Sequence, residues 1–299
     1  MRYTETKFNQ HTLEFDSWQE YVDYAANTPS TLASGQRASR SQDSVHNRPE
    51  RHHIVKVWAG YASFEEAVDK STNGWPEGAA ELAKTFNDFH IPAQRTETEM
   101  AFTPVGPGTL AMGRYIQGHP EPFMVQRETD RMLDAPAGVG GVVHLGINIS
   151  QNANVTATQR FQLGALILSL VDMLERNGKR VELTMITASE GSQDGHTRIM
   201  GKGKKADSSI NMSILAACFA NAGTQRRLNF SVRETLPAVS HKSMGIPNGG
   251  YAHSNGRWHP SGCTLVEGLE SINNLNNKEE TKAWLKRQLA QQGIAWDGE

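Results

Sequence analysis

The sequence predicts an α/β fold: a mixed sheet built on a βαβ unit, with helices on both sides. Residues 140–150 (GGVVHLGINIS) and 179–189 (KRVELTMITAS) are rich in the β-branched residues that strands favour. The segment between them, 156–178, has the length of a multi-turn helix, and its central part is apolar nearly all round. A strand, a long helix and a strand in this order indicate two parallel strands joined by a right-handed crossover.

Capping patterns predict the helices. Three precede residue 91: 16–27, capped by Asp16 or Ser17; 63–71, which opens with a capping box from Ser63 to Glu66; and 75–90, with Pro76 in its first turn. The long central helix begins with a second capping box, Thr156 to Gln159, and ends before Gly178, a residue type common just past helix ends. We expect a further helix at 210–222, capped by Ser208 or Ser209.

Weaker patterns predict the remaining elements. Residues 54–60 (IVKVWAG) and 226–234 (RRLNFSVRE) are expected to be strands, and the middle of the chain suggests a strand near Ala101 and a short helix at 112–118. The C-terminal segment 278–293 places Trp284, Leu285 and Leu289 on one helical face. We expect this face to dock on the body of the protein or on a partner.

Two segments have the composition of loops. Residues 29–53 are rich in Ser, Arg and His and have too few apolar side chains to offset the entropy of ordering, so we expect a mobile basic loop. Residues 236–262 form a long glycine-rich loop. The expected organisation is therefore an N-terminal helical segment (1–28), the mobile loop (29–53), an α/β core (54–235), the glycine-rich loop (236–262) and a C-terminal helical extension (263–299).

Composition excludes several classes of protein. The chain of 299 residues has no run of 18 apolar residues and no apolar N-terminal stretch, so we expect neither a membrane span nor a secretory signal. Its two cysteines, Cys218 and Cys263, lie outside any CxxC pattern and are expected to be reduced thiols of a cytosolic protein.

Known nucleotide-binding and catalytic motifs fail when their spacing is checked. In RIMGKGKKADSS (198–209) the glycines are one residue apart, whereas a P-loop separates its two glycines by four residues. The run GVGGVV precedes a strand instead of following one, and no Gly-x-Ser-x-Gly elbow occurs. We therefore expect no enzymatic activity and no cofactor.

The charge is distributed unevenly along the chain. Residues 195–260 contain nine Lys or Arg and two acidic residues, a net charge of +7, while the whole chain has a net charge of −2. Single-stranded nucleic acid binds to basic grooves that also offer rings for base stacking. The predicted DNA-binding residues combine both: Arg37, Arg40, Arg198, Lys202, Lys204, Lys205, Arg226, Arg227, Tyr251, Arg257 and Trp258.

The end of the first predicted strand of the βαβ unit resembles the metal motif of von Willebrand A-type domains, Asp-x-Ser-x-Ser. Here Asn148 stands in place of the aspartate, and Ser150 and Asn152 hold the later positions. Loss of the charged ligand removes most of the attraction for Mg²⁺. The motif thus favours a von Willebrand A-like fold without a metal.

Four strings, in this order, resemble a family of tailed-phage proteins: 60–82 (GYASFEEAVDKSTNGWPEGAAEL), 114–124 (RYIQGHPEPFM), 163–185 (LGALILSLVDMLERNGKRVELTM) and 225–234 (QRRLNFSVRE). The family includes a single-stranded DNA-binding RNA polymerase cofactor of podophages that carry a giant virion RNA polymerase. The resemblance implies a fold unlike an OB barrel. It also implies a protein of the host bacterial cytoplasm that holds melted promoter DNA and recruits the phage RNA polymerase.

Two functions from different classes follow. The first is sequence-tolerant binding of single-stranded DNA in transcription, with phage RNA polymerase as the partner. The alternative is a virion or assembly protein with a von Willebrand A-like interaction domain. The sequence leaves the oligomeric state open, a homo-oligomer included.

Overall fold

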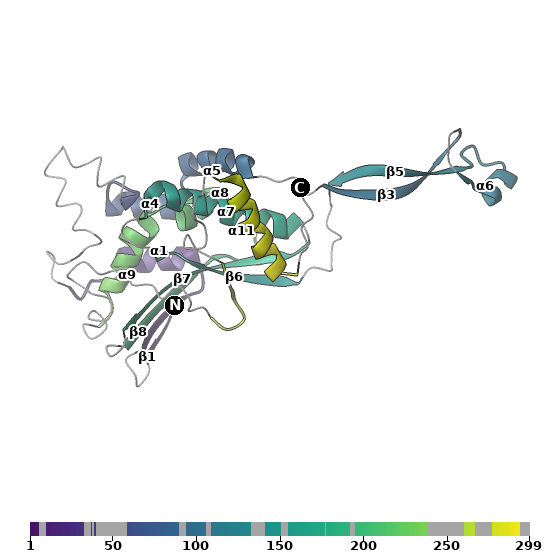
Figure 1. The fold of residues 1–299 in the computed structure, drawn as a ribbon. Helices are drawn as coiled ribbons and strands as arrows, with labels where there is room; N and C mark the ends of the chain where they lie inside the picture. The colour runs from purple at the N-terminus through teal and green to yellow at the C-terminus, as the bar shows by residue number, and fades with distance from the viewer. Residues whose placement is uncertain are drawn as a thin grey trace.

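The computed structural model confirms a mixed α/β fold with a six-stranded mixed sheet, flanked by helices (Figure 1). The structure describes the following residues: 1–5, 10–32, 37, 39, 59–89, 94–105, 109–132, 141–150, 155–176, 178–191, 195–237, 260–266 and 277–293. The expected mobile loop (29–53), the strand expected at 54–60 and the expected glycine-rich loop (236–262) lie mostly outside these ranges.

The main sheet has the strand order β1-β2-β8-β7-β6-β9. Its strands are β1 (Arg2–Glu5), β2 (Gln10–Phe15), β6 (Val142–Asn148), β7 (Arg180–Gly191), β8 (Gly195–Lys204) and β9 (Thr264–Val266). Strands β6 and β7 are parallel neighbours, and helix α7 (Ala157–Arg176) connects them, as the βαβ prediction required. Strand β8 returns antiparallel to β7, whereas β2 is parallel to β8 and β9 is parallel to β6.

Strands from the N-terminal and the C-terminal parts of the chain belong to the main sheet, which the sequence analysis did not predict. The N-terminal segment was expected to be helical, yet β1 and β2 precede helix α1 (Trp18–Asn27). In β2, buried His11, Leu13 and Phe15 alternate with half-buried neighbours. This period of two is the mark of a strand that covers a core on one side. At the other end, three residues of β9 pair with β6.

The helices are α1, α4 (Phe64–Asn73), α5 (Pro76–Phe89), α6 (Met112–Ile116), α7, α8 (Met212–Leu215), the π-helical turns η4 (Ala216–Ala220) and η5 (Thr224–Asn229), α9 (Phe230–Glu234) and α11 (Lys278–Gln291). Those that pack on the main sheet lie on one side of it, so the expectation of helices on both sides is wrong for the described residues (Figure 1). We call this side the helix face and the opposite side the outer face.

The start and the packing of α7 follow from its sequence. Thr156 Oγ1 accepts from the Gln159 N–H at 3.1 Å, and Gln159 Oε1 accepts from the Thr156 N–H at 2.9 Å, which is the predicted capping box. Gly178 has φ 76°, a conformation that favours glycine. Inside the helix, a Cβ on Gly164 would lie 2.5 Å from Ala220, so only glycine lets α7 approach η4 this closely.

The prediction of a strand at 226–234 is wrong, because this segment is helical. Its apolar residues Leu228, Phe230 and Val232 alternate as in a half-buried strand. In the fold, however, every residue from 226 to 234 is buried, including the polar ones between them. Because the segment is enclosed on all sides, alternation carries no information about its faces, and tertiary packing decides its conformation.

Two further expectations concern helix starts and the C-terminal helix. The helix expected at 210–222 is capped by Asn211, whose side chain accepts from the Ile214 N–H, instead of by Ser208 or Ser209. Helix α11 contacts α7 and α5 with Trp284 and Leu285 buried, which confirms docking on the body.

A three-stranded antiparallel sheet extends away from the body (Figure 1). Strands β3 (Gln94–Thr103) and β5 (Phe123–Met132) form a long hairpin, and its tip carries β4 (Thr109–Leu110) and α6. We call residues 94–132 the arm. None of the helices in the described part of the chain combines the length and the apolar character needed to cross a bilayer.

Candidate functional site

The basic stretch that suggested a DNA contact, 198–205, lies mostly in strand β8. A bulge in this strand places Lys202 and Lys204 on opposite faces of the sheet. Strand β8 ends at Lys204, and its register against β7 shifts between Leu183 and Thr184, because Lys202 pairs with Thr184 and Lys204 with Leu183. Gly203 is therefore an extra residue, as in a β-bulge. Its Cβ would lie 2.6 Å from Phe219 on the helix face.

The bulge turns Lys204 toward the helix face, where its side chain is 2% exposed. Its ammonium pairs with Glu175 of α7 at 2.7 Å and donates to the Val181 carbonyl at 3.1 Å. Lys204 thus connects β8 to α7 and is not available to a polyanion. The expectation that it contacts DNA is wrong because the strand irregularity reverses its direction.

Two predicted arginines are also buried. Arg226 donates to the Val155 carbonyl at 2.6 Å. Arg227 is fully buried and donates to three backbone carbonyls, those of Tyr61, Ala62 and Ser39. Their role is to satisfy loop carbonyls inside the protein, so neither belongs to a surface groove. Arg37 is half-buried and donates to the Leu32 carbonyl.

The outer face keeps three of the predicted cations within reach of solvent. Arg198 and Lys202 lie four residues apart on β8, so both project from the same side of the strand, and Lys205 is exposed just beyond its end. Lys202 pairs with Glu182 on β7 at 3.3 Å.

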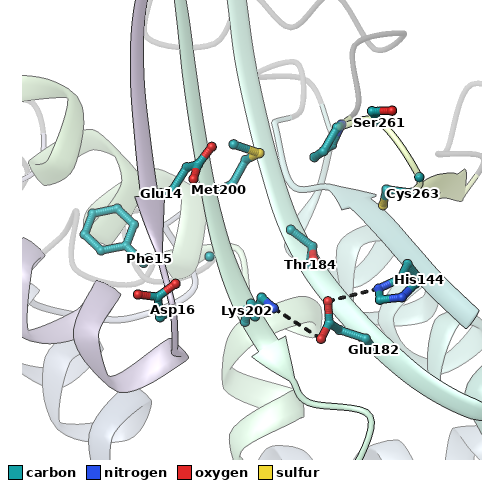
Figure 2. Close-up of a pocket in the computed structure, with 13 residues that line it drawn as sticks. Glu14, Phe15, Asp16, His144, Glu182, Thr184, Met200, Lys202, Ser261 and Cys263 are labelled. Atoms are coloured by element: carbon teal, nitrogen blue, oxygen red, sulfur yellow. Dashed lines mark hydrogen bonds and ion pairs between the residues drawn. The ribbon is translucent and has the colours of Figure 1, made fainter. Parts of the chain in front are cut away.

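Glu182 lies between two basic groups from the neighbouring strands (Figure 2). Its second oxygen contacts His144 Nδ1 of β6 at 3.1 Å. The His144 and Lys202 side chains are 46% and 39% exposed, and Glu182 is 15% exposed. A carboxylate in this position holds Lys202 and His144 in place, and it also reduces the positive potential that Lys202 presents to solvent.

A pocket of about 340 Å³ opens over this network. Its floor is the outer face of β8, β7, β6 and the end of β2, and its rim includes residues 260–263 (Figure 2). Cys263 packs on the floor, since a Cβ on Gly146 would lie 2.8 Å from its sulfur. Burial, with the charge of Glu182 adding to it, raises the pKa of the Cys263 thiol to about 11. At neutral pH this group is therefore a protonated, unreactive wall of the pocket.

The position that resembles the von Willebrand metal motif has an arginine beside it. Ser150 follows β6, and its hydroxyl shares a hydrogen bond with Thr187 of β7. The buried guanidinium of Arg233 donates to both hydroxyls. A positive group from the protein's own chain thus contacts the hydroxyl of Ser150, the second position of the motif, while Asn152 lies outside the described residues.

A sequence profile described as a domain of unknown function, DUF7192, matches residues 2–295. The chain belongs to the DUF7192 family. No curated protein and no solved structure matches it. The family match spans both the main sheet and the arm, so this member of DUF7192 is described by one family over nearly its whole length.

Four predicted site residues of this DUF7192 chain lie outside the described ranges: Arg40, Tyr251, Arg257 and Trp258. Arg257 and Trp258 precede the pocket-rim residue Pro260 by three and two positions in the sequence. Sequence reasoning missed His144 and Glu182. Each is next to apolar strand residues: His144 precedes Leu145, and Glu182 lies between Val181 and Leu183, all of which are buried. Because successive strand residues point to opposite sides of a sheet, this alternation was sufficient to assign His144 and Glu182 to the outer face.

Proposed function

We propose that the chain binds single-stranded DNA on the outer face of its main sheet. The observation that carries the proposal is the shared outward direction of Arg198 and Lys202 on β8, beside a pocket whose rim at Pro260 follows Arg257 and Trp258 in the sequence. This surface offers charges for phosphates, and the sequence places an aromatic residue two positions before the rim residue Pro260. Both are what a single strand requires.

The size of the pocket favours a single strand over a duplex. A volume of about 340 Å³ is of the order that takes one small planar group, whereas bases of a duplex are already stacked on one another. Positive charges alone would attract both forms of DNA. Strand preference therefore separates a base-binding site from a general polyanion patch.

Fluorescence anisotropy with labelled dT oligonucleotides and with duplexes of equal length tests the proposal. We expect tighter binding to the single strand, with an affinity that falls as salt rises because phosphate binding releases counterions. Equal affinity for both forms would contradict base binding and leave only a charged surface. Absence of binding to either form at low salt would overturn the proposal.

Within this proposal the protein acts as a phage transcription cofactor in the host bacterial cytoplasm, and the arm contacts the phage RNA polymerase. Support comes from the tip of the arm, where Val105, Met112, Tyr115 and Ile116 are between 59% and 83% exposed. Beside them Arg114 stacks 3.9 Å from the centre of the Phe102 ring. Met, Tyr and Arg are the residue types enriched in protein interfaces.

The double variant Tyr115→Ala/Ile116→Ser tests the partner. We expect it to lose co-precipitation of the phage polymerase while it keeps the wild-type affinity for dT oligonucleotides. Thr109→Ala, also at an exposed position of the arm, is the matched control. Unchanged polymerase association in the double variant would contradict the role of the arm.

The alternative, a virion or assembly protein, is favoured by the same exposed tip. In that case the tip binds structural proteins or further copies of the chain, and the outer face has no DNA ligand. Sedimentation that shows tip-dependent assembly in a protein without oligonucleotide binding would support this alternative over the first proposal.

A further inference from the structure

A second basic site lies in the helix layer, away from the outer face. Four arginines are buried there: Arg160, Arg226, Arg227 and Arg233. The last three donate to carbonyls or hydroxyls of the protein. Arg160 differs from them, because both of its terminal nitrogens, Nη1 and Nη2, have no hydrogen-bond partner among the described residues.

Arg160 is only 2% exposed, so solvent cannot take the place of the missing partners. A buried guanidinium without acceptors is costly, since the charge has lost its hydration and gained nothing in return. No carboxylate in the described part of the chain forms an ion pair with it. The protein's own groups therefore leave a positive charge uncompensated.

Two positive groups lie near Arg160, and the neighbouring Cys218 does not compensate them at neutral pH, because burial raises the pKa of its thiol and keeps it protonated. Arg160 is in the first turn of α7, where the helix dipole places its positive end. The guanidinium of Arg226 is also at this point, since its Nη2 donates to the Val155 carbonyl just before the helix begins. Arg160, the Arg226 guanidinium and the N-terminus of α7 thus lie in one region of the protein.

The location is one at which α/β proteins bind ligands. Helix α7 follows β6, so its first turn lies near the carboxyl ends of the parallel strands β6 and β7. In open α/β sheets, ligands bind in the crevice outside these strand ends. Val155 is half-exposed, so the site lies directly beneath the surface.

From this arrangement we propose that Arg160 and Arg226, at the start of α7, bind a phosphate group. A tetrahedral oxoanion would accept from the free Nη1 and Nη2 of Arg160 and would compensate the charges of both guanidinium groups and of the helix end. Burial lowers the pKa of Arg160 to about 10, and the nearby charge of Arg226 acts in the same direction. The charge of a bound anion would raise the pKa of Arg160 again, because it stabilises the protonated guanidinium.

This site does not depend on DNA binding at the outer face. The phosphate group could belong to free inorganic phosphate or to the end of a nucleic acid strand, and the recognition chemistry is the same for both. Comparison of dT oligonucleotides with a 5′-phosphate or a 5′-hydroxyl distinguishes these sources: tighter binding of the phosphorylated strand, lost in the Arg160 variant, identifies a strand end.

Thermal unfolding of the full chain in sodium phosphate and in sodium chloride of equal ionic strength tests the proposal. We expect phosphate to raise Tm by at least about 2 °C and to saturate, as binding to the folded state requires. Arg160→Met should abolish the phosphate effect. In chloride it should leave Tm unchanged or raised, because it removes an uncompensated buried charge while keeping apolar volume.

Two results would overturn the site. One is a Tm of the wild-type chain that does not respond to phosphate. The other is an equal phosphate effect in wild type and Arg160→Met, which would indicate general stabilisation by an excluded salt. If Arg160→Met does not fold, Arg160→Lys takes its place: it retains one charge without the forked donors, and we expect phosphate affinity at least about tenfold weaker. An unchanged affinity in Arg160→Lys would equally overturn the proposal.

Discussion

Lys202 and Lys204 are two residues apart on β8, yet they belong to opposite faces of the main sheet. Lys202 lies on the outer face, half-exposed and paired with Glu182, while Lys204 is buried on the helix face and paired with Glu175. The difference comes from one extra residue, Gly203, in the bulge between them. Positive charge in a sequence therefore predicts a polyanion contact only when the strand register is also known.

The helix face should depend on packing far more than the outer face does. Truncation after Asn277 removes α11 and with it the buried side chains of Trp284, Leu285 and Leu289. Each buried apolar side chain of this size contributes about 1.5–3 kcal/mol. We expect the free energy of unfolding, measured in urea, to fall by several kcal/mol. A chain that ends at Gly293 keeps α11 and is the control; an equal unfolding midpoint for both truncations would contradict the packing role.

The two lysines provide the sharpest comparison of the faces. Lys204→Met leaves Glu175 and the Val181 carbonyl without their buried ammonium, so we expect a loss of about 1–3 kcal/mol in unfolding free energy. Lys202→Met, at a half-exposed position, should change it by less than about 0.5 kcal/mol. Urea denaturation of both variants measures this difference. Equal losses would show that the bulge does not separate the lysines as described.

A substitution of Glu182 is expected to increase the affinity of the proposed site for DNA. Glu182→Gln removes the carboxylate that holds Lys202 and His144 and that repels phosphates. We expect binding of dT oligonucleotides at low salt to tighten about two- to fivefold, as for the loss of one partly exposed like charge. Anisotropy titrations measure the change. Weaker binding in Glu182→Gln would indicate that the carboxylate itself contacts the ligand.

The smallest effect is expected at the pocket wall. Because the pKa of the Cys263 thiol is raised to about 11, its alkylation by iodoacetamide should be slow at pH 8 and should accelerate about tenfold for each pH unit up to that value. An oligonucleotide bound over the pocket should slow it further. Mass spectrometry of the Cys263 peptide measures the rate. Rapid alkylation at pH 8 that bound DNA leaves unchanged would place the ligand elsewhere.

Local patterns in the sequence were sufficient to predict an element when it has one buried face or a clear capping residue. The capping boxes at Ser63 and Thr156 both occur, as does the βαβ unit, because these depend on neighbouring residues. Long-range packing decided the rest. Enclosure on all sides makes 226–234 helical, and the pairing of β2 with β8 requires a partner almost two hundred residues away.

The site was predicted less well than the fold because burial decides which basic residues are available. Arg226 and Arg227 stand between the polar Gln225 and the apolar Leu228, and their charges suggested a surface. Inside the fold they donate to loop carbonyls that no helix or strand satisfies. Charge counts along a sequence cannot distinguish these buried arginines from arginines on an exposed DNA-binding surface.

The salt dependence of DNA binding tests the central claim, that the outer face of the main sheet binds single-stranded DNA. Each phosphate neutralised on a single strand contributes about 0.7 to the slope of log affinity against log salt. The double variant Arg198→Ala/Lys202→Ala should flatten this slope by up to about 1.4, while Lys84→Ala, at an exposed position of α5, should leave it unchanged. Wild-type affinity and slope in the double variant would contradict the claim.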